Sequence, residues 1–273
     1  CMLQFAKRMP SRCFDTGIAE SHAVTFASGL AVGGMIPIFA VYSTFLQRAY
    51  DQLLNDTAIM NNHIVLAVDR AGIVPDEGET HQGIFDVAFL STIPNTVIYA
   101  PATFEELKLH LKKAVYEETG IAAVRYPRGG EPTTLTDYRP AYTAYTLEEN
   151  DAAQTLVITY GREYAQVLPA AAMMTQNGQP VSVLKLNRIY PVDAQVIEIA
   201  KRYDRVVFVE EGAKRGGLGE QIASLLMENG FKGRYVVRAI DGFIPPCTLE
   251  EGMKRYGLDA DSVYTLLAQG DAV

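Results

Sequence analysis

The sequence predicts an α/β protein with two three-layer α/β/α domains and mainly parallel sheets. Short apolar runs of strand length alternate with amphipathic stretches of helical length, which is the pattern of βαβ units. Several of these runs are apolar throughout, as expected of strands covered by helices on both faces of a sheet. The length of 273 residues corresponds to about two typical domains.

The first half of the chain contains four expected strands and three expected helices. We predict the strands at residues 36–41, 63–68, 96–100 and 122–126. We predict the helices at residues 20–33, 44–60 and 103–118. Residues 129–150 interrupt this alternation with glycines, prolines and an acidic run, which is typical of a linker.

The alternation resumes after the interruption. We expect strands at 155–160, 181–186, 205–209 and 235–239, helices at 163–177, 193–202 and 217–229, and a helical stretch at 248–270. These elements predict one domain over residues 1–130, a linker over 131–150 and a second domain over 151–273.

Composition excludes several classes of function. The net charge of −8 and the isoelectric point of about 5.1 argue against broad binding to nucleic acid or to an anionic membrane. No apolar run reaches the roughly 18 residues of a membrane span. Three cysteines form neither a disulfide framework nor a metal-binding spacing, so we expect a cytoplasmic protein with no metal ligands in this chain. Because the chain starts at Cys1 and not at Met, we expect a piece of a longer protein.

Ligands of open α/β sheets bind beyond the carboxyl ends of the strands, which directs attention to three segments. The first contains Glu20, where an extended segment becomes a helix. The alternative interpretation of Glu20 is a carboxylate that only complements the helix dipole. His22 alone is better explained as a structural histidine.

The second segment begins at the end of the strand at 36–41. Tyr42, Phe45 and Arg48 follow one another at a spacing of three residues. An aromatic ring and an arginine at the start of a helix can stack on a flat ring or hold an anion. Alternatively, Phe45 belongs to the core and Arg48 pairs with Asp51 or Asp56.

The third segment is the long polar loop at 69–83, and loops of this length in compact domains are often functional. His81 is its best acid–base candidate, because histidine titrates near neutral pH. Asp76, Glu77 and Glu79 would otherwise be solvated surface. At the end of the strand at 122–126, Arg128 before two glycines suits a phosphate or a carboxylate. Between a strand and a helix, Glu210-Glu211-Gly212 is followed by Gly216-Gly217-Leu218-Gly219, and we interpret this segment as a tight turn into the helix.

Together these segments resemble one family of thiamine diphosphate enzymes of the transketolase type, the 1-deoxy-D-xylulose-5-phosphate synthases. The resemblance rests on Gly17-Ile18-Ala19-Glu20-Ser21-His22-Ala23, Tyr42-Ser43-Thr44-Phe45-Leu46-Gln47-Arg48, Asp69-Arg70-Ala71-Gly72, Thr80-His81-Gln82-Gly83 and Tyr126-Pro127-Arg128-Gly129. It implies a transketolase pyrimidine-binding domain, with its first strand truncated, followed by a transketolase C-terminal domain. The family is about twice as long as this chain, and its other half holds the cofactor diphosphate through Mg²⁺.

The resemblance also implies roles for individual residues. Glu20 matches the catalytic glutamate that bonds to N1′ of the cofactor aminopyrimidine, and Phe45 matches the aromatic ring that stacks on it. Tyr42 matches a residue that lines the cofactor and substrate pocket, and Arg48 an arginine that contacts an anion or packs on the cofactor. His81 matches a histidine that moves protons at the reacting carbonyls. Arg70 and Arg128 match arginines that bind the acceptor substrate.

The loop before His81 departs from the family pattern, which has an aspartate that contacts substrate. Ungapped alignment places Glu77 at that position, with Asp76 one residue away. Ser21 stands where the family more often has glutamine.

The implied reaction joins pyruvate to D-glyceraldehyde 3-phosphate in a homodimeric transferase, and the chain alone would be inactive. The alternatives are a natural subunit of a split transketolase or of a 2-oxo acid dehydrogenase, and a non-catalytic α/β module.

Overall fold

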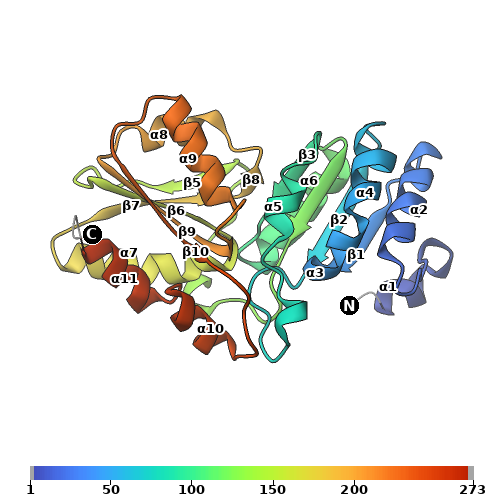
Figure 1. The fold of residues 1–273 in the computed structure, drawn as a ribbon, viewed down its shortest axis with the longest axis horizontal. Coiled ribbons are helices and arrows are strands. Elements are labelled where there is room, and N and C mark those ends of the chain that lie inside the picture. Colours follow the sequence, from blue (N-terminus) through green and yellow to red (C-terminus); the bar gives the residue numbers. More distant parts are fainter. Residues whose placement is uncertain (1–2, 270–273) are drawn as a thin grey trace.

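The computed structural model describes residues 3–269, and these form two α/β units side by side (Figure 1). The predicted fold class is confirmed, because each unit has a five-stranded, mostly parallel sheet with helices on both faces. The strand orders are β1-β2-β4-β3-β8 in the first sheet and β10-β9-β6-β7-β5 in the second. In residues 3–269, none of the helices combines the length and the hydropathy that a membrane crossing needs.

The first unit contains the elements up to residue 125. Its helices are α1 (Leu3–Arg8), α2 (Glu20–Val32), α3 (Ser43–Leu46), α4 (Tyr50–Gln52), α5 (Asp86–Leu90) and α6 (Phe104–Tyr116), and its strands are β1 (Ile38–Tyr42), β2 (Ile64–Asp69), β3 (Thr96–Tyr99) and β4 (Ile121–Arg125). Helix α6 packs on one face of the sheet, and α2 and α5 pack on the other. Strands β2 and β4 are buried along their length, whereas the edge strand β1 is half exposed.

The second unit holds the later elements apart from β8. Its strands are β5 (Tyr145–Glu148), β6 (Thr155–Tyr160), β7 (Val181–Leu186), β9 (Arg205–Ala213) and β10 (Arg234–Ile240), and its helices are α7 (Tyr164–Gln176), α8 (Ala194–Ala200), α9 (Leu218–Glu228), α10 (Leu249–Tyr256) and α11 (Ala260–Ala268). Helices α8 and α9 cover one face of the sheet, and α7, α10 and α11 cover the other (Figure 1). Strand β5 is antiparallel to β7 and lies inside the stretch 131–150.

One strand from the second half of the chain completes the first sheet. Strand β8 (Arg188–Tyr190), which follows β7 in the chain, pairs antiparallel with β3 at the edge of the first sheet. A buried ion pair lies nearby, with Lys185 Nζ of β7 2.8 Å from Glu106 Oε1 of α6. The second unit is therefore anchored on the first by both backbone and side-chain contacts.

Three local predictions differ in detail from the structure. The helix expected at 44–60 is broken into α3, a 3₁₀ turn at Gln47–Ala49, the short α4 and a π-helical segment at Leu53–Ala58. The stretch expected to be helical at 248–270 is two helices, because Gly257 adopts a left-handed conformation that ends α10.

The third difference lies in the segment at 210–219, where the turn into α9 is confined to residues 214–217. Strand β9 continues through Glu210 and Glu211 to Ala213, and both carboxylates are buried. Glu210 accepts hydrogen bonds from the amides of Leu218 and Gly219 at the start of α9, at 3.2 and 2.9 Å. Burial nevertheless raises the pKa of Glu210 to about 7.

Glu163 gives the second unit a pH-dependent stability. Its carboxyl group is fully buried and both oxygens lack a hydrogen-bond partner within the part of the chain that the structure describes. Burial, reinforced by the nearby Glu211 and opposed by Arg162, raises its pKa well above the ordinary 4.5. The folded protein therefore keeps a proton that the unfolded chain releases. Stability falls by about 1.4 kcal/mol per pH unit from about pH 4.5 up to the folded pKa.

We predict that Glu163→Gln removes this pH dependence, because glutamine imitates the neutral acid in both states. Urea unfolding at pH 4 and pH 7 should show a gain in the free energy of unfolding at pH 7 and little change at pH 4. The control is Glu198→Gln, because Glu198 is exposed on α8 and paired with Lys201. Equal changes at the two pH values would contradict the assignment.

Candidate active site

The candidate residues gather at the carboxyl edge of the first sheet. Strands β1, β2 and β4 are parallel and in register, with Tyr42 opposite Asp69 and Val68 opposite Arg125. The segments that follow these strands therefore begin side by side. Glu20 joins them from the first turn of α2.

Glu20 and Arg48 form the first part of the site. Nη1 of Arg48 lies 3.2 Å from both carboxylate oxygens of Glu20, and the side chain of Glu20 is 11% exposed whereas that of Arg48 is 51% exposed. Ser21 Oγ donates to the carbonyl of Arg48 at 2.7 Å and holds the 3₁₀ turn against α2. Neither alternative partner takes Arg48, because Asp51 accepts from Asn55 and Asp56 accepts from Thr25.

Phe45 is the centre of an aromatic cluster. Its ring lies nearly parallel to Tyr42, with centroids 5.6 Å apart, and edge-to-face with His81 at 5.3 Å. The Arg48 guanidinium lies over the Phe45 ring at 4.8 Å. Phe45 is half-buried, so it is not part of the closed core that the alternative interpretation required.

The His81 loop is tied to this cluster by polar contacts. Thr44 Oγ1 of α3 donates to the carbonyl of Thr80 at 2.8 Å, and Thr80 Oγ1 lies 3.1 Å from His81 Nδ1. The buried Gln82 side chain closes the loop internally through the amide and carbonyl of Val74 at 2.8 and 3.1 Å. The imidazole of His81 is thus held beside Phe45 by its own loop and by α3.

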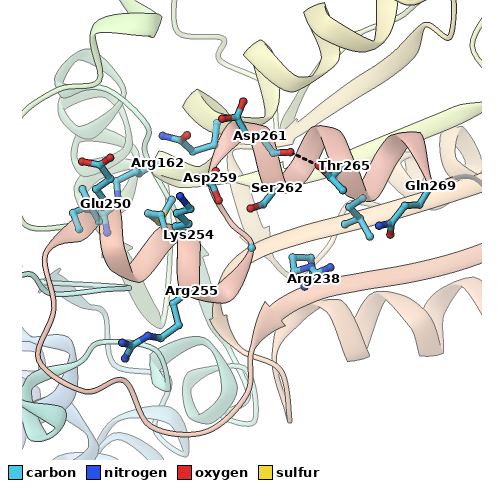
Figure 2. Close-up of a pocket in the computed structure, with 15 residues that line it drawn as sticks. Arg162, Arg238, Glu250, Lys254, Arg255, Asp259, Asp261, Ser262, Thr265 and Gln269 are labelled. Carbon is cyan, nitrogen blue, oxygen red and sulfur yellow. Dashed lines mark hydrogen bonds between the residues drawn. The ribbon is translucent and has the colours of Figure 1, made fainter.

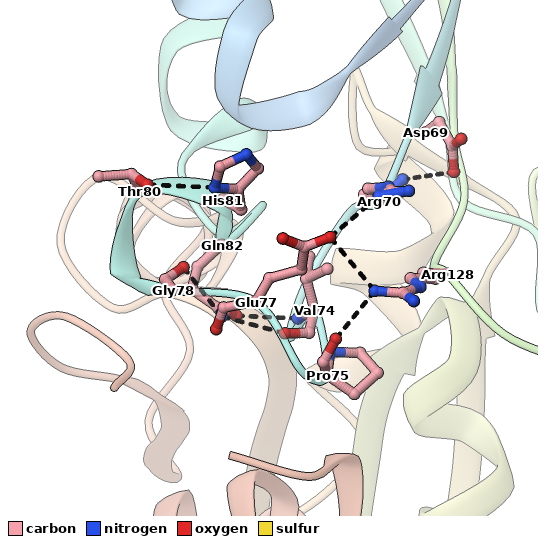
Figure 3. A network of polar contacts seen from close by, with 10 residues as sticks. All are labelled: Asp69, Arg70, Val74, Pro75, Glu77, Gly78, Thr80, His81, Gln82 and Arg128. Atoms are coloured by element: carbon pink, nitrogen blue, oxygen red, sulfur yellow. Dashed lines mark hydrogen bonds and ion pairs between the residues drawn. The ribbon is translucent and has the colours of Figure 1, made fainter. Parts of the chain in front are cut away.

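Two arginines converge on Glu77, as Figure 3 shows. Glu77 Oε1 lies 3.5 Å from Nη1 of Arg70 and 3.4 Å from Nη1 of Arg128. Arg128 also donates to the carbonyl of Pro75 at 3.0 Å, and the Arg70 guanidinium lies 3.9 Å from the centre of the Tyr42 ring. Asp76 is exposed and its amide bonds to the carbonyl of Cys247. Of the two acids considered for the aspartate position, Glu77 is the one that meets the arginines.

The backbone of this loop is conformationally strained at two places. Arg70 and Asp76 have positive φ angles of 59° and 62°, which side-chain-bearing residues seldom adopt. Such conformations cost about 1–3 kcal/mol each and concentrate at functional sites. In Arg70 the strained turn directs the guanidinium from the end of β2 toward Tyr42 and Glu77.

The site includes two residues that sequence reasoning missed, Arg162 and Glu211 of the second unit. Glu211 Oε1 accepts from the amide of Ile73 at 2.6 Å, and Arg162 donates to the carbonyls of Ile73 and Arg128 at 3.0 and 3.3 Å. The two adjacent glutamates after the apolar run of β9 were a signal of a buried carboxylate, but the amide that Glu211 binds is 138 residues away in the chain.

A hollow of about 950 Å³ lies on the second unit between α7, α10, α11 and β10, and Arg162 is part of its wall (Figure 2). Cations and acids both line it: Arg162, Arg238, Lys254, Arg255, Glu250, Asp259 and Asp261. Because its charges are mixed, they select no class of ligand. The chemical groups at the carboxyl edge of the first sheet are therefore the better candidate site.

Two protein-family models match the chain and show the class of protein to which it belongs. Residues 2–132 match the transketolase pyrimidine-binding domain, and residues 144–263 match the transketolase C-terminal domain. The chain therefore belongs to the transketolase-like proteins and contains these two domains.

Curated proteins of similar sequence narrow the family to which the chain is related. The chain is 40% identical over 95% of its length to 1-deoxy-D-xylulose-5-phosphate synthase of Chlorobaculum tepidum, and it covers 41% of that protein. It is 41% identical over 98% of its length to the synthase of Caldanaerobacter subterraneus subsp. tengcongensis, and it covers 43% of that protein. The chain thus spans about two fifths of the length of the curated relatives it matches.

Solved structures share the architecture. A structure described as a split gene transketolase, an inactive beta4 tetramer, superposes with a TM-score of 0.84 at 26% identity, covering 97% of this chain and 85% of that one. The transketolase of Campylobacter jejuni superposes with a TM-score of 0.75 at 18% identity, covering 94% of this chain and 39% of that one, and shows the fold alone.

Proposed function

We propose that this chain supplies the pyrimidine-binding and C-terminal domains of a thiamine diphosphate-dependent 1-deoxy-D-xylulose-5-phosphate synthase. The reaction would join pyruvate to D-glyceraldehyde 3-phosphate, giving 1-deoxy-D-xylulose 5-phosphate and CO₂. The observation that carries the proposal is the continuous set of contacts from Glu20 through Arg48, Phe45 and Tyr42 to Arg70. This set links the carboxylate of Glu20 through two aromatic rings to Arg70, and Arg70 meets Arg128 at Glu77.

The residues present fit the pyrimidine ring of the cofactor. Glu20 is a sheltered carboxylate that can bond a ring nitrogen, and Phe45, which contacts the same Arg48 guanidinium, offers an aromatic surface for stacking. The planar guanidinium of Arg48 already donates a hydrogen bond to Glu20 and lies over the Phe45 ring in the structure. Thiamine diphosphate, when bound, supplies the nucleophilic carbon and the electron sink for decarboxylation of a 2-oxo acid.

The protein groups divide the remaining tasks. Glu20 holds or releases a proton at the ring nitrogen of the pyrimidine. His81, held through Nδ1 by Thr80, is positioned to exchange a proton at the substrate carbonyl oxygens through Nε2. Arg70 and Arg128 are close enough to meet at one carboxylate oxygen, so together they can bind one anionic group of the acceptor.

Further parts of the proposal concern the assembly. We place the cofactor diphosphate and its Mg²⁺ on a domain outside this chain, and we expect a cytoplasmic homodimer. We call this chain together with the diphosphate-binding domain encoded in the same genome the complete enzyme. We expect the chain alone to be inactive.

A second candidate is a natural subunit of a split transketolase. It is favoured by one observation, the extensive match to the split gene transketolase chain, most of which this chain covers. This candidate predicts a sugar phosphate donor and no release of CO₂, so the donor distinguishes the two.

The proposed function is tested by measuring which donor and which acceptor substrates the complete enzyme prefers. We expect CO₂ release from pyruvate only when an acceptor aldehyde is consumed, and a higher kcat/KM for D-glyceraldehyde 3-phosphate than for D-glyceraldehyde. Arg128→Met should lower kcat/KM for the phosphorylated acceptor by about 10–100-fold, the value of a lost charged hydrogen bond, and spare the other acceptor. Transfer from a sugar phosphate without CO₂ would favour the split transketolase instead.

A further inference from the structure

The loop that carries Glu77 and His81 closes at its base on a carboxylate from the other unit. Gly72 and Gly83 exchange two backbone hydrogen bonds, at 2.7 and 2.9 Å. A Cβ atom on Gly72 would lie 2.5 Å from the carboxyl carbon of Glu211, and the φ angle of Gly72 is +82°. The Glu211 carboxylate therefore packs directly on the loop backbone, and its Oε1 also accepts from the amide of Ile73.

Arg162 extends this contact to a second segment of the site. It forms a two-point ion pair with Glu211, with Nε 3.0 Å from Oε2 and Nη2 against Oε1. The same guanidinium donates to the carbonyl of Ile73 at 3.0 Å and to that of Arg128 at 3.3 Å. Arg162 and Glu211 are 8% and 5% exposed, so solvent does not compete for these bonds. A planar fork of donors fixes direction as well as distance.

The two backbone segments that Arg162 binds carry Glu77 and Arg128, whose side chains contact each other. Ile73 is four residues before Glu77, and Arg128 itself contacts Glu77 and Pro75 (Figure 3). We propose that Arg162 and Glu211 are positioning residues, which set the separation of the Glu77 loop and Arg128 and thereby the binding of the acceptor phosphate. This inference rests on the proposed function, because it assigns the acceptor to Arg70 and Arg128.

A role in stability alone does not account for the pair. Burying two charges costs several kcal/mol, and apolar replacements of buried ion pairs are often neutral or stabilising. Here the pair instead makes three hydrogen bonds to backbone groups of Ile73 and Arg128, in addition to the two-point contact between Arg162 and Glu211. Misplacing reactive groups by about 1 Å can cost about 100-fold in rate.

The test compares steady-state kinetics and melting temperatures of the complete enzyme carrying Arg162→Met, Arg162→Lys or Glu211→Gln. We expect Arg162→Met to raise KM for the acceptor about 10–100-fold, with KM for pyruvate within about twofold. Glu211→Gln keeps one oxygen for the Ile73 amide, so its effect should be smaller. Arg162→Lys keeps the positive charge but loses the planar set of guanidinium donors. We therefore expect its KM for the acceptor to stay above that of the unmodified enzyme. The matched control, Arg202→Met, removes an exposed arginine that pairs with Glu149 at 2.8 Å.

Hydrogen exchange of the same variants separates this inference from the proposed function. We expect faster amide exchange in Arg162→Met confined to residues 70–83 and 126–130. If the unmodified complete enzyme makes no product, the proposed function fails, and exchange alone then decides whether the pair positions the loop. Unchanged exchange, or equal losses for donor, acceptor and melting temperature, would overturn the inference.

Discussion

Glu20→Gln is expected to lower turnover of the complete enzyme by about 10²–10⁴-fold, the usual contribution of a group that transfers a proton in the reaction. Glutamine keeps the size and one oxygen but cannot hold or release a proton at the pyrimidine. It also removes the charge that draws Arg48 to within 3.2 Å. The measurement is the rate of pyruvate-dependent product formation at saturating cofactor and substrates.

The control for Glu20 is Asp51→Asn. Asp51 is an exposed carboxylate a few residues after Arg48, and its own partner is Asn55 at 2.7 Å. We expect this variant to keep turnover within about twofold, as is usual for surface positions away from the site. If Glu20→Gln were as active as Asp51→Asn, the cofactor role of Glu20 would be wrong.

Lys185→Met is expected to lower the free energy of unfolding by about 3–5 kcal/mol. Lys185 and Glu106 are fully buried, and Nζ of Lys185 lies 2.8 Å from Glu106 Oε1 and 2.6 Å from Asn187 Oδ1. Removing the ammonium group leaves a buried carboxylate with only the Ala102 amide and the Tyr138 hydroxyl as donors. Burial opposes the charge of Glu106, but Lys185, the Ala102 amide and Tyr138 together lower its pKa.

The double variant Lys185→Met/Glu106→Gln isolates the cost of the unpaired charge. We expect it to recover a large part of the loss, because the remaining groups are neutral. Lys201→Met, which removes an exposed pair with Glu198 at 2.9 Å, should change stability by less than about 1 kcal/mol. Urea unfolding monitored in both units reports the effect. A loss from Lys185→Met no larger than that from Lys201→Met would contradict an anchoring role for the buried pair.

Much of the fold could be predicted from apolar runs, because buried parallel strands require them. Strands β2, β4, β6 and β7 lie close to their predicted positions. Strands β5 and β8 were missed because their pairing is set by tertiary contacts. Strand β8 has three residues and pairs with a strand almost 90 residues earlier. Local periodicity carries no information about such a partner.

The breaks in the helix expected at 44–60 have a different cause. The apolar periodicity there is real, since Leu46, Ala49 and Leu53 are all fully buried. Periodicity does not distinguish an α-helix from a succession of α, 3₁₀ and π turns that present the same side chains. The 3₁₀ turn at Gln47–Ala49 places Arg48 beside Glu20 rather than beside Asp51.

For the candidate site, strand ends selected the segments, and the family resemblance selected the residues within them that the structure brings together. The sheet rule explains why, because parallel strands end at one edge. The contribution of Arg162 and Glu211 could not be predicted, because it depends on how the second unit packs against the loop. Their roles, like those of Glu20 and His81, remain predictions for experiment.

The most direct test of the central claim compares the chain alone with the complete enzyme. Each is supplied with thiamine diphosphate, Mg²⁺, pyruvate and D-glyceraldehyde 3-phosphate, and 1-deoxy-D-xylulose 5-phosphate is measured. We expect product and CO₂ in equal amounts from the complete enzyme and none from the chain alone. Product from the chain alone, or none from a complete enzyme that binds the cofactor, would contradict it.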